Sequence, residues 1–282
     1  MSIDIYYYSG TGNSLYVARE FQKRIPEANL IPIIRLLSRG AIRTSADTVG
    51  FVFPNFCLTI PIPIYEFLHK ADLASAGYIF AICTRGGSQT EAFEYMDEIL
   101  EVHGKALNAR LDINMPWNHC FGKENLPGTN SAERIAHLEA QMQSLLDDFC
   151  RSIIAREPYL QKDAGDYELS AGMKLFDLLV PKSLNYKSHE YLYRNLVHFL
   201  ADSECSGCGI CAKVCINEKI VLVDKKPNWK EDVPCYACFA CINYCPRKAI
   251  QVQSRFPIRS YTAVNDRYHH KSVTYKEIAE QR

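Results

Sequence analysis

Eight of the twelve cysteines lie between residues 205 and 245, and their spacing constrains this chain more than any other feature. They form two repeats of the pattern C-x2-C-x2-C-x3-C, and Pro246 follows the second repeat. Bacterial proteins use this spacing to bind two [4Fe-4S] clusters, and the fourth cysteine of each repeat binds the cluster of the other repeat. That rule assigns one cluster to Cys205, Cys208, Cys211 and Cys245, and the second cluster to Cys235, Cys238, Cys241 and Cys215.

Zinc, disulfide bonds and free thiols each fit the cysteines less well. A zinc site commonly uses two C-x2-C pairs, which would leave half of these sulfurs without a role. A disulfide framework is typical of short secreted chains, and this chain does not have that character. Free structural cysteines would not repeat at a fixed spacing. We therefore interpret the two repeats as ligands of two iron-sulfur clusters.

Length and charge limit the class of protein to which this chain can belong. A chain of 282 residues can form one large domain and a small one. Lys plus Arg equals Asp plus Glu at 32 each, so we expect neither nucleic acid nor an anionic membrane as a partner. The first residues lack the features of a signal peptide, and the most apolar stretch, residues 51–68, contains three prolines and makes a poor membrane span. Thiols kept free for iron indicate a reducing compartment, so we expect a cytoplasmic protein from an oxygen-poor setting.

The N-terminus predicts a phosphate-binding loop. An apolar strand at residues 3–8 is followed by a loop of small residues and then by a helix at residues 15–25. Two glycines let successive N–H groups face one anion, hydroxyls can donate to its oxygens, and the helix N-terminus adds a positive dipole. The loop has no lysine, and Leu15 stands where a dinucleotide fold has its third glycine, so a phosphomonoester is favoured. An ordinary strand-to-helix turn with a Ser or Asn cap is the alternative. The loop consists of Ser9, Gly10, Thr11, Gly12, Asn13 and Ser14.

Strands and helices alternate through the N-terminal half. We predict further strands at residues 30–34, 49–53, 78–83 and 107–115, with the first at a sheet edge because it contains Pro32. This alternation predicts a doubly wound parallel sheet, in which ligands bind beyond the carboxyl ends of the strands. The loops at residues 9–14, 54–58, 84–88 and 116–121 would then meet at one edge, where the first holds the phosphate and the others flank a planar ring.

Several side chains in these loops allow two interpretations. Phe56 and Trp117 could stack on a ring, or they could pack under a neighbouring helix. Arg85 could offset negative charge or lie in solvent. His119 beside Cys120 could suggest a catalytic pair, but neighbouring loop residues rarely point at the same atom. The four cysteines without ligand spacing are predicted to be buried as small apolar residues: Cys57, Cys83, Cys120 and Cys150.

The C-terminal half begins with a long predicted helix at residues 130–156, which Asn130 and Glu133 would open as a capping box. We predict a helical connector at residues 167–193, strands at residues 197–201, 220–223 and 250–252, and a connecting loop at residues 225–232. The histidine pair in the tail at residues 267–270 could cover a cofactor or could simply be exposed.

With these motifs, the sequence resembles fused flavodoxin-ferredoxin proteins of anaerobic bacteria and archaea, the EFR-type ferredoxin family. The loop at residues 9–14 matches the flavodoxin pattern [ST]-x-T-G-[NT]-[ST], and the C-terminal half shows a cluster motif, Pro227-x-Trp229 and a second cluster motif. Two positions depart from the family pattern, because Ile216 and Lys271 replace its usual prolines. The resemblance implies FMN, with its phosphate held by Ser9, Thr11, Gly12, Asn13 and Ser14. It also implies that the loops beginning at Pro54 and Thr84 embrace the flavin ring. Together with Trp117, these loops give the candidate contacts of the ring: Pro54, Asn55, Phe56, Thr84, Arg85, Gly86, Gly87 and Trp117.

The implied architecture is α/β, with a flavodoxin-like doubly wound parallel five-stranded sheet and a small α+β domain with two [4Fe-4S] clusters. The predicted division is an FMN-binding domain at residues 1–160, a helical connector at 161–196, a ferredoxin domain at 197–254 and a tail at 255–282.

Three functions are compatible with these motifs. The favoured one is an electron-transfer flavoprotein that passes electrons between FMN and the clusters, with redox proteins as donor and acceptor. A second is a flavin-dependent reductase with its own small substrate. A third is a binding module whose clusters report oxygen or iron to a partner protein.

Overall fold

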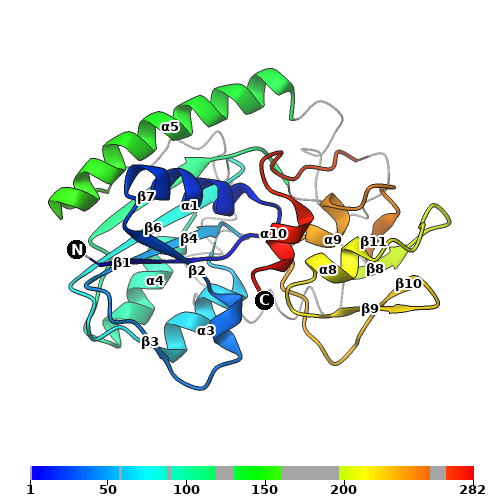
Figure 1. Cartoon of the computed structure of the whole chain (residues 1–282), viewed down its shortest axis with the longest axis horizontal. Coiled ribbons are helices and arrows are strands. Elements are labelled where there is room, and N and C mark those ends of the chain that lie inside the picture. The colour runs from blue at the N-terminus through cyan, green and yellow to red at the C-terminus, as the bar shows by residue number, and fades with distance from the viewer. Residues whose placement is uncertain (1, 57–58, 88–89, 119–129, 161–196, 255–264) are drawn as a thin grey trace, which may run out of the picture.

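The computed structural model describes residues 2–56, 59–87, 90–118, 130–160, 197–254 and 265–282 (Figure 1). The elements of its N-terminal half are β1 (Ile3–Tyr7), α1 (Asn13–Arg24), β2 (Ala28–Pro32), α2 (Ile34–Leu37), β3 (Ile42–Arg43), β4 (Thr48–Pro54), α3 (Ile62–Lys70), β5 (Ala71–Asp72), β6 (Tyr78–Arg85), α4 (Ala92–Glu101), β7 (Ala109–Asn114) and α5 (Ala132–Ala155). The C-terminal half contains β8 (Val197–Ala201), α8 (Ile210–Val214), β9 (Ile220–Val223), β10 (Lys226–Trp229), α9 (Ala240–Asn243), β11 (Ile250–Ser254) and α10 (Tyr275–Ala279).

Five parallel strands form the central sheet in the order β2-β1-β4-β6-β7. Every residue of β4 and β6 is buried, which is why these strands are continuous apolar runs in the sequence. β2 lies at the edge, where Pro32 needs no ladder hydrogen bond of its own. This order is that of a flavodoxin-like fold, with the switch in strand order between β1 and β4. The predicted doubly wound five-stranded sheet is confirmed.

Helices cover both faces of the sheet, with α1 and α5 on one side and α3 and α4 on the other (Figure 1). Aromatic side chains fill the layers between helices and strands. Phe80 of β6 stacks on Phe21 of α1 with ring centroids 5.2 Å apart, and it meets Phe149 of α5 edge-on. On the opposite face, Phe67 of α3 packs on Tyr6 of β1 with centroids 4.6 Å apart.

The start of α5 differs from the predicted capping box. The helix begins at Ala132, and the Ser131 side chain caps it by accepting a hydrogen bond from the Arg134 N–H. Asn130 serves a different purpose, because its side chain accepts a hydrogen bond from the Trp117 N–H at 2.9 Å and donates to the Trp117 carbonyl at 2.7 Å. The predicted N-cap thus holds a loop at the carboxyl edge of the sheet, and the residue after it supplies the cap.

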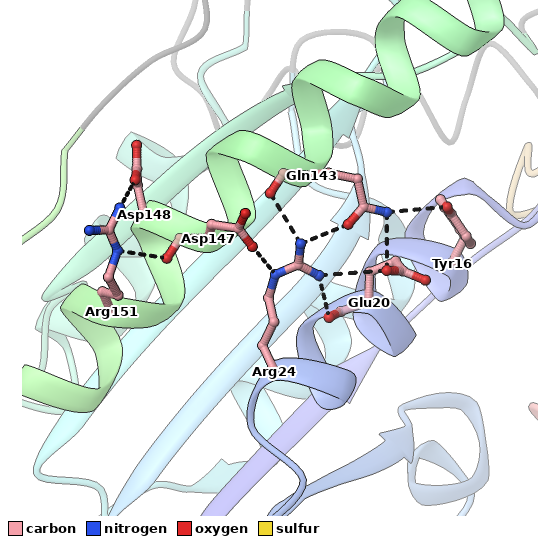
Figure 2. A network of polar contacts seen from close by, with 7 residues as sticks. All are labelled: Tyr16, Glu20, Arg24, Gln143, Asp147, Asp148 and Arg151. Atoms are coloured by element: carbon pink, nitrogen blue, oxygen red, sulfur yellow. Dashed lines mark hydrogen bonds and ion pairs between the residues drawn. The ribbon is translucent and has the colours of Figure 1, made fainter.

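A polar network fastens α5 to α1 (Figure 2). Arg24 of α1 pairs with Asp147 at 2.6 Å and donates to the Gln143 amide oxygen at 2.7 Å. The Gln143 amide group donates in turn to the buried Glu20 carboxylate at 3.0 Å and to the Tyr16 hydroxyl at 3.4 Å. Burial by itself would raise the pKa of Glu20, but hydrogen bonds from Lys23 and Gln143 lower it below its usual value. The network therefore holds the charged Glu20 carboxylate of α1, the helix that starts at the predicted phosphate loop, against α5.

The C-terminal half contains two small antiparallel sheets, β8 with β11 and β9 with β10. The strand β10 corrects the connecting loop predicted at residues 225–232. Asp224 and Lys225 both have positive φ, 48° and 61°, which is the conformation of a tight two-residue hairpin turn. The sequence does not predict this turn because it lacks the Asn-Gly or Asp-Gly pair that marks such hairpins.

The chain ends against both halves of the molecule, and α10 lies between α1 and α8 (Figure 1). The predicted connector at residues 167–193 lies outside the described residues, so the domain boundaries stay a prediction. Within the described ranges, none of the helices combines the length and the apolar character that crossing a bilayer requires.

Candidate functional site

The loop at residues 9–14 joins β1 to α1 at the carboxyl edge of the sheet. Gly12 is the N-cap residue and has a φ of 102°, a conformation that side chains with a Cβ rarely adopt. Although the loop is polar, Ser9, Thr11 and Ser14 are at most 2% exposed. The Ser9 hydroxyl accepts a hydrogen bond from the Gly12 N–H at 3.2 Å, so this turn is closed by its own side chain.

The open donors of this loop are backbone groups. In the described part of the chain, the N–H groups of Thr11, Asn13 and Ser14 have no hydrogen-bond acceptor. Asn13 and Ser14 form the first turn of the 12-residue helix α1, where the N–H groups lack partners within the helix and the dipole is positive. A loop with unpaired donors at a helix N-terminus can hold an anion such as a phosphate group.

Neighbouring strand ends meet this loop. Thr84 of β6 lies beside Pro54 of β4, and its hydroxyl is 2.8 Å from the Ser14 hydroxyl. The Thr84 carbonyl accepts a hydrogen bond from the Asn55 N–H at 2.7 Å. The Asn13 amide group donates to the Pro116 carbonyl at 3.0 Å. The sheet therefore brings the predicted loops to one edge, although Thr84 and Arg85 are the last residues of β6 rather than loop residues.

Both candidate stacking aromatics have protein contacts here. Phe56 meets Tyr8 edge-on with ring centroids 6.0 Å apart. Trp117 lies against Gly86, where an added Cβ would stand 2.5 Å from Cε3 of the indole. Both side chains are partly exposed, and Arg85 is 5% exposed rather than solvated. Whether a flavin ring stacks on either aromatic stays a prediction.

The eight repeat cysteines surround two separate cavities. Cys205, Cys208, Cys211 and Cys245 line one cavity, together with Ile210, Leu222 and Ile250. The other cavity is lined by Cys215, Cys235, Cys238 and Cys241, together with Ile216, Ile220 and Phe239. Each cavity thus gathers three cysteines of one repeat and the fourth cysteine of the other repeat. We call these sets the first and the second cysteine set.

The backbone of the two repeats is also equivalent. Residues with positive φ occur in pairs thirty positions apart, the same offset that separates Cys205 from Cys235: Gly207 with Ala237, Gly209 with Phe239, and Glu218 with Lys248. Left-handed residues alternating with ordinary ones turn successive N–H groups toward a common point, an arrangement known from iron-sulfur sites. Ala237 and Phe239 hold this conformation without being glycine, so their surroundings must enforce it.

Burial shifts the pKa of several thiols in the two cysteine sets. Burial raises the pKa of Cys211 and Cys235 to about 11 and that of Cys238 to about 12, so without metal these thiols keep their protons. Backbone N–H groups point at some of the sulfurs, including the Ala249 N–H at 3.2 Å from the Cys245 sulfur. Among the described residues, no three His, Cys, Asp or Glu side chains converge on one point as ligands of a single ion would. Each of the two cavities has four sulfurs in its lining.

The second cysteine set packs directly on the loop at residues 9–14. An added Cβ at Gly10 would stand 2.5 Å from the Cys238 carbonyl oxygen and 2.8 Å from its Cβ, so only glycine permits this approach. Asn118 donates from its amide group to the Thr11 hydroxyl and accepts at its carbonyl a hydrogen bond from the buried Asn243 of α9 at 3.2 Å. The candidate phosphate site and one cysteine set are therefore in contact.

The tail contributes Gln281, which the sequence did not reveal as part of this site, and His270 of the histidine pair. The Gln281 side chain accepts a hydrogen bond from the Ser9 N–H at 2.9 Å and donates to the Ser9 carbonyl at 2.8 Å. The His270 N–H donates to the Thr11 carbonyl at 2.8 Å, and its ring stacks on Tyr16 of α1 with centroids 3.8 Å apart. Both side chains are fully buried. Of the histidine pair, only His269 is exposed.

Burial lowers the pKa of His270 to about 4, against the opposing influence of the Glu139 carboxylate 3.5 Å away. The Ser272 N–H donates to Nδ1 of the ring at 3.2 Å, so the neutral tautomer carries its proton on Nε2. A neutral imidazole therefore stacks on Tyr16, while the backbone N–H of the same residue bonds to the loop.

The remaining candidates have simpler roles. Cys83 and Cys150 are buried, at 0% and 3% exposure, which confirms that they behave as apolar residues. Cys57, His119 and Cys120 lie outside the described residues.

Comparisons with known proteins cover about half of the chain. An archaeal flavodoxin is 15% identical and covers 52% of this chain and 98% of its own, with a TM-score of 0.33. The two-electron reduced flavodoxin of Megasphaera elsdenii is 12% identical, covers 51% of this chain and 98% of its own, and has a TM-score of 0.30. An azoreductase from Bacillus anthracis str. Sterne is 11% identical, covers 54% of this chain and 100% of its own, and has a TM-score of 0.35.

No protein-family model and no curated protein matches this chain. The order of the five strands, rather than these low scores, establishes the flavodoxin-like fold.

Proposed function

We propose that this protein is an electron-transfer flavoprotein, which passes electrons between FMN and two [4Fe-4S] clusters and so links two-electron and one-electron redox partners. The resemblance to fused flavodoxin-ferredoxin proteins motivates this assignment. The observation that carries it is the contact between Gly10 of the candidate phosphate loop and Cys238 of the second cysteine set. A cluster bound there would lie beside the flavin site, where electrons need only cross a short span of packed protein.

The residues at the loop fit the phosphate of FMN. The unpaired N–H groups of Thr11, Asn13 and Ser14 would donate to its oxygens. In this proposal Thr84 supports the site through its hydroxyl, and the loops of Pro54, Asn55 and Phe56, of Gly86 and Gly87, and of Trp117 flank the ring.

The two cysteine sets fit two clusters. Each set supplies four sulfurs around a cavity whose other walls are mainly apolar, and backbone N–H groups point at the sulfurs. The proposal gives residues 197–254 the role of a ferredoxin domain and residues 1–160 that of an FMN domain, with residues 255–282 as the tail that joins them. FMN exchanges two electrons and each cluster one, and the protein contributes distance, burial and hydrogen bonds.

Anaerobic reconstitution tests the proposal. The whole chain, supplied with FMN, iron and sulfide, should retain one FMN and about eight irons per chain. A protein that retains four irons or fewer would refute the two-cluster proposal, and a protein that binds no FMN would refute the flavin part.

Two cysteine variants test how the sets are divided. Cys245→Ser should damage the cluster of Cys205, Cys208 and Cys211, whereas Cys215→Ser should damage the other cluster, although each cysteine belongs to the opposite repeat. Electron paramagnetic resonance distinguishes the two reduced clusters. Cys150 lies outside both sets, so the Cys150→Ala protein should keep all its iron. If each substitution instead damaged the cluster bound by the other three cysteines of its own repeat, the assignment would be contradicted.

A further inference from the structure

Tyr8 has a buried hydroxyl at the edge of the candidate phosphate loop. The residue follows β1 and comes directly before the loop at residues 9–14, and its side chain is 0% exposed. Its ring meets Phe56 edge-on. In the described part of the chain, the phenol oxygen has no hydrogen-bond partner. A buried donor without a partner is costly and rare in folded proteins, so this hydroxyl is a candidate donor to a bound group.

The surroundings of the hydroxyl identify that acceptor. Two residues further along the chain, Gly10 touches the backbone of Cys238. Tyr8 belongs to the main hydrophobic core, against which Tyr236 and Cys238 also pack. Burial raises the pKa of Tyr8 well above its usual value, and negative charge on Cys238, Cys235 and Cys215 would raise it further. The phenol is therefore neutral and keeps its proton, and the thiols that act on it electrostatically belong to the second cysteine set.

We propose that the Tyr8 hydroxyl donates a hydrogen bond to a sulfur of the cluster held by the second cysteine set and thereby raises the reduction potential of that cluster. The inference rests on the proposed function, because it needs that cluster. Hydrogen bonds to the sulfurs are one of the means by which a protein sets the potential of an iron-sulfur cluster. The reduced cluster carries one more negative charge than the oxidised one, so a donor stabilises the reduced form more. Tyr8 would thus favour electron flow into the cluster nearest the flavin site.

Tyr8→Phe removes only the hydroxyl, and Tyr6→Phe, two residues earlier in β1, is its matched control. The Tyr6 hydroxyl interacts with Thr44 and Asp4, away from both cysteine sets. The experiment is a potentiometric titration of the anaerobic holoprotein, followed by electron paramagnetic resonance, with iron and FMN counted in each sample.

At a fixed applied potential, we expect Tyr8→Phe to lower the reduced-to-oxidised ratio of the second cluster about tenfold, which for a one-electron couple is a shift of about 59 mV to lower potential. The first cluster and the Tyr6→Phe protein should titrate like the wild type. An unchanged potential in a Tyr8→Phe protein with full iron content would overturn the inference.

Two further outcomes remain decisive. If Tyr8→Phe loses iron, Tyr8→Leu provides a second protein without the hydroxyl, and it should show the same shift. Loss of iron from both variants, with Tyr6→Phe intact, would also overturn the inference, because a hydrogen bond that tunes the potential does not decide whether the cluster is held. A wild-type protein that binds no clusters would instead refute the proposed function itself.

Discussion

Replacing Gln281 with alanine tests how firmly the tail holds the candidate phosphate loop. The Gln281 side chain satisfies both the N–H and the carbonyl of Ser9, at 2.9 and 2.8 Å, and it is fully buried. Each hydrogen bond of this kind contributes about 1 kcal/mol, and a buried group left without a partner costs about 1–3 kcal/mol. Because the tail can open at its end and admit water, we expect a loss near the lower end of this range, about 2–3 kcal/mol in all.

The effect should be local, so amide hydrogen exchange is the appropriate assay. A loss of about 2–3 kcal/mol corresponds to roughly 30- to 150-fold faster exchange at residues that open together with the tail. We expect this acceleration at residues 9–14 and 270–281, with little change in β4 and β6. FMN should bind more weakly, because the loop must be ordered again when the ligand binds.

Arg282→Ala is the matched control for Gln281→Ala. The side chain of the neighbouring Arg282 forms a surface ion pair with Glu218 at 3.4 Å, a kind of contact that contributes little. Exchange at residues 9–14 should stay within a few-fold of the wild type in this control. Equal exchange rates at residues 9–14 in the two variants would refute the role we give to Gln281.

Two further predictions concern the same contact region. Gly10→Ala should force the loop away from Cys238 and so weaken FMN binding at least tenfold, while both clusters remain. Gly40 lies in open space, so the control Gly40→Ala should have no effect. Flavin titration and iron analysis compare the two variants. The second concerns pH: because burial lowers the folded-state pKa of His270 to about 4 from 6.5, its contribution is fully present above pH 6.5 and is lost as the pH falls toward 4. Denaturant unfolding should show that the free energy of unfolding falls by about 3 kcal/mol between pH 6.5 and 4 because of His270, whose charged neighbours are Glu139 and Lys271. In the His270→Gln protein, the free energy of unfolding should change less over this pH range.

The central sheet and the cysteine sets could be predicted because their signals are local and periodic. The strands β4 and β6 are buried on both faces, so their short apolar runs indicate central strands of a parallel sheet. The cysteine spacing predicts the same grouping of Cys215 and Cys245 that the two cavities show. In both cases residues that act together stand at fixed intervals in the chain.

The contact that Gln281 of the tail makes could not be predicted, because it leaves no such pattern in the sequence. Gln281 binds the backbone of Ser9, far away in the sequence, and any residue at position 9 except proline offers the same N–H and carbonyl. The helix α10 has only five residues and one buried side chain, Ile278, so it has no apolar stripe. Likewise, the contact of Gly10 with Cys238 depends on how the two halves pack, which neither motif encodes by itself.

The rate of electron transfer from flavin to cluster tests the central claim most directly. After the FMN of the anaerobic holoprotein is reduced by a light pulse, the clusters should be reduced in a first-order reaction whose rate constant does not change with protein concentration. That result follows from a cluster beside residues 9–14 of the same chain. A rate that rises in proportion to the protein concentration would show that electrons pass between different chains, and it would contradict the account.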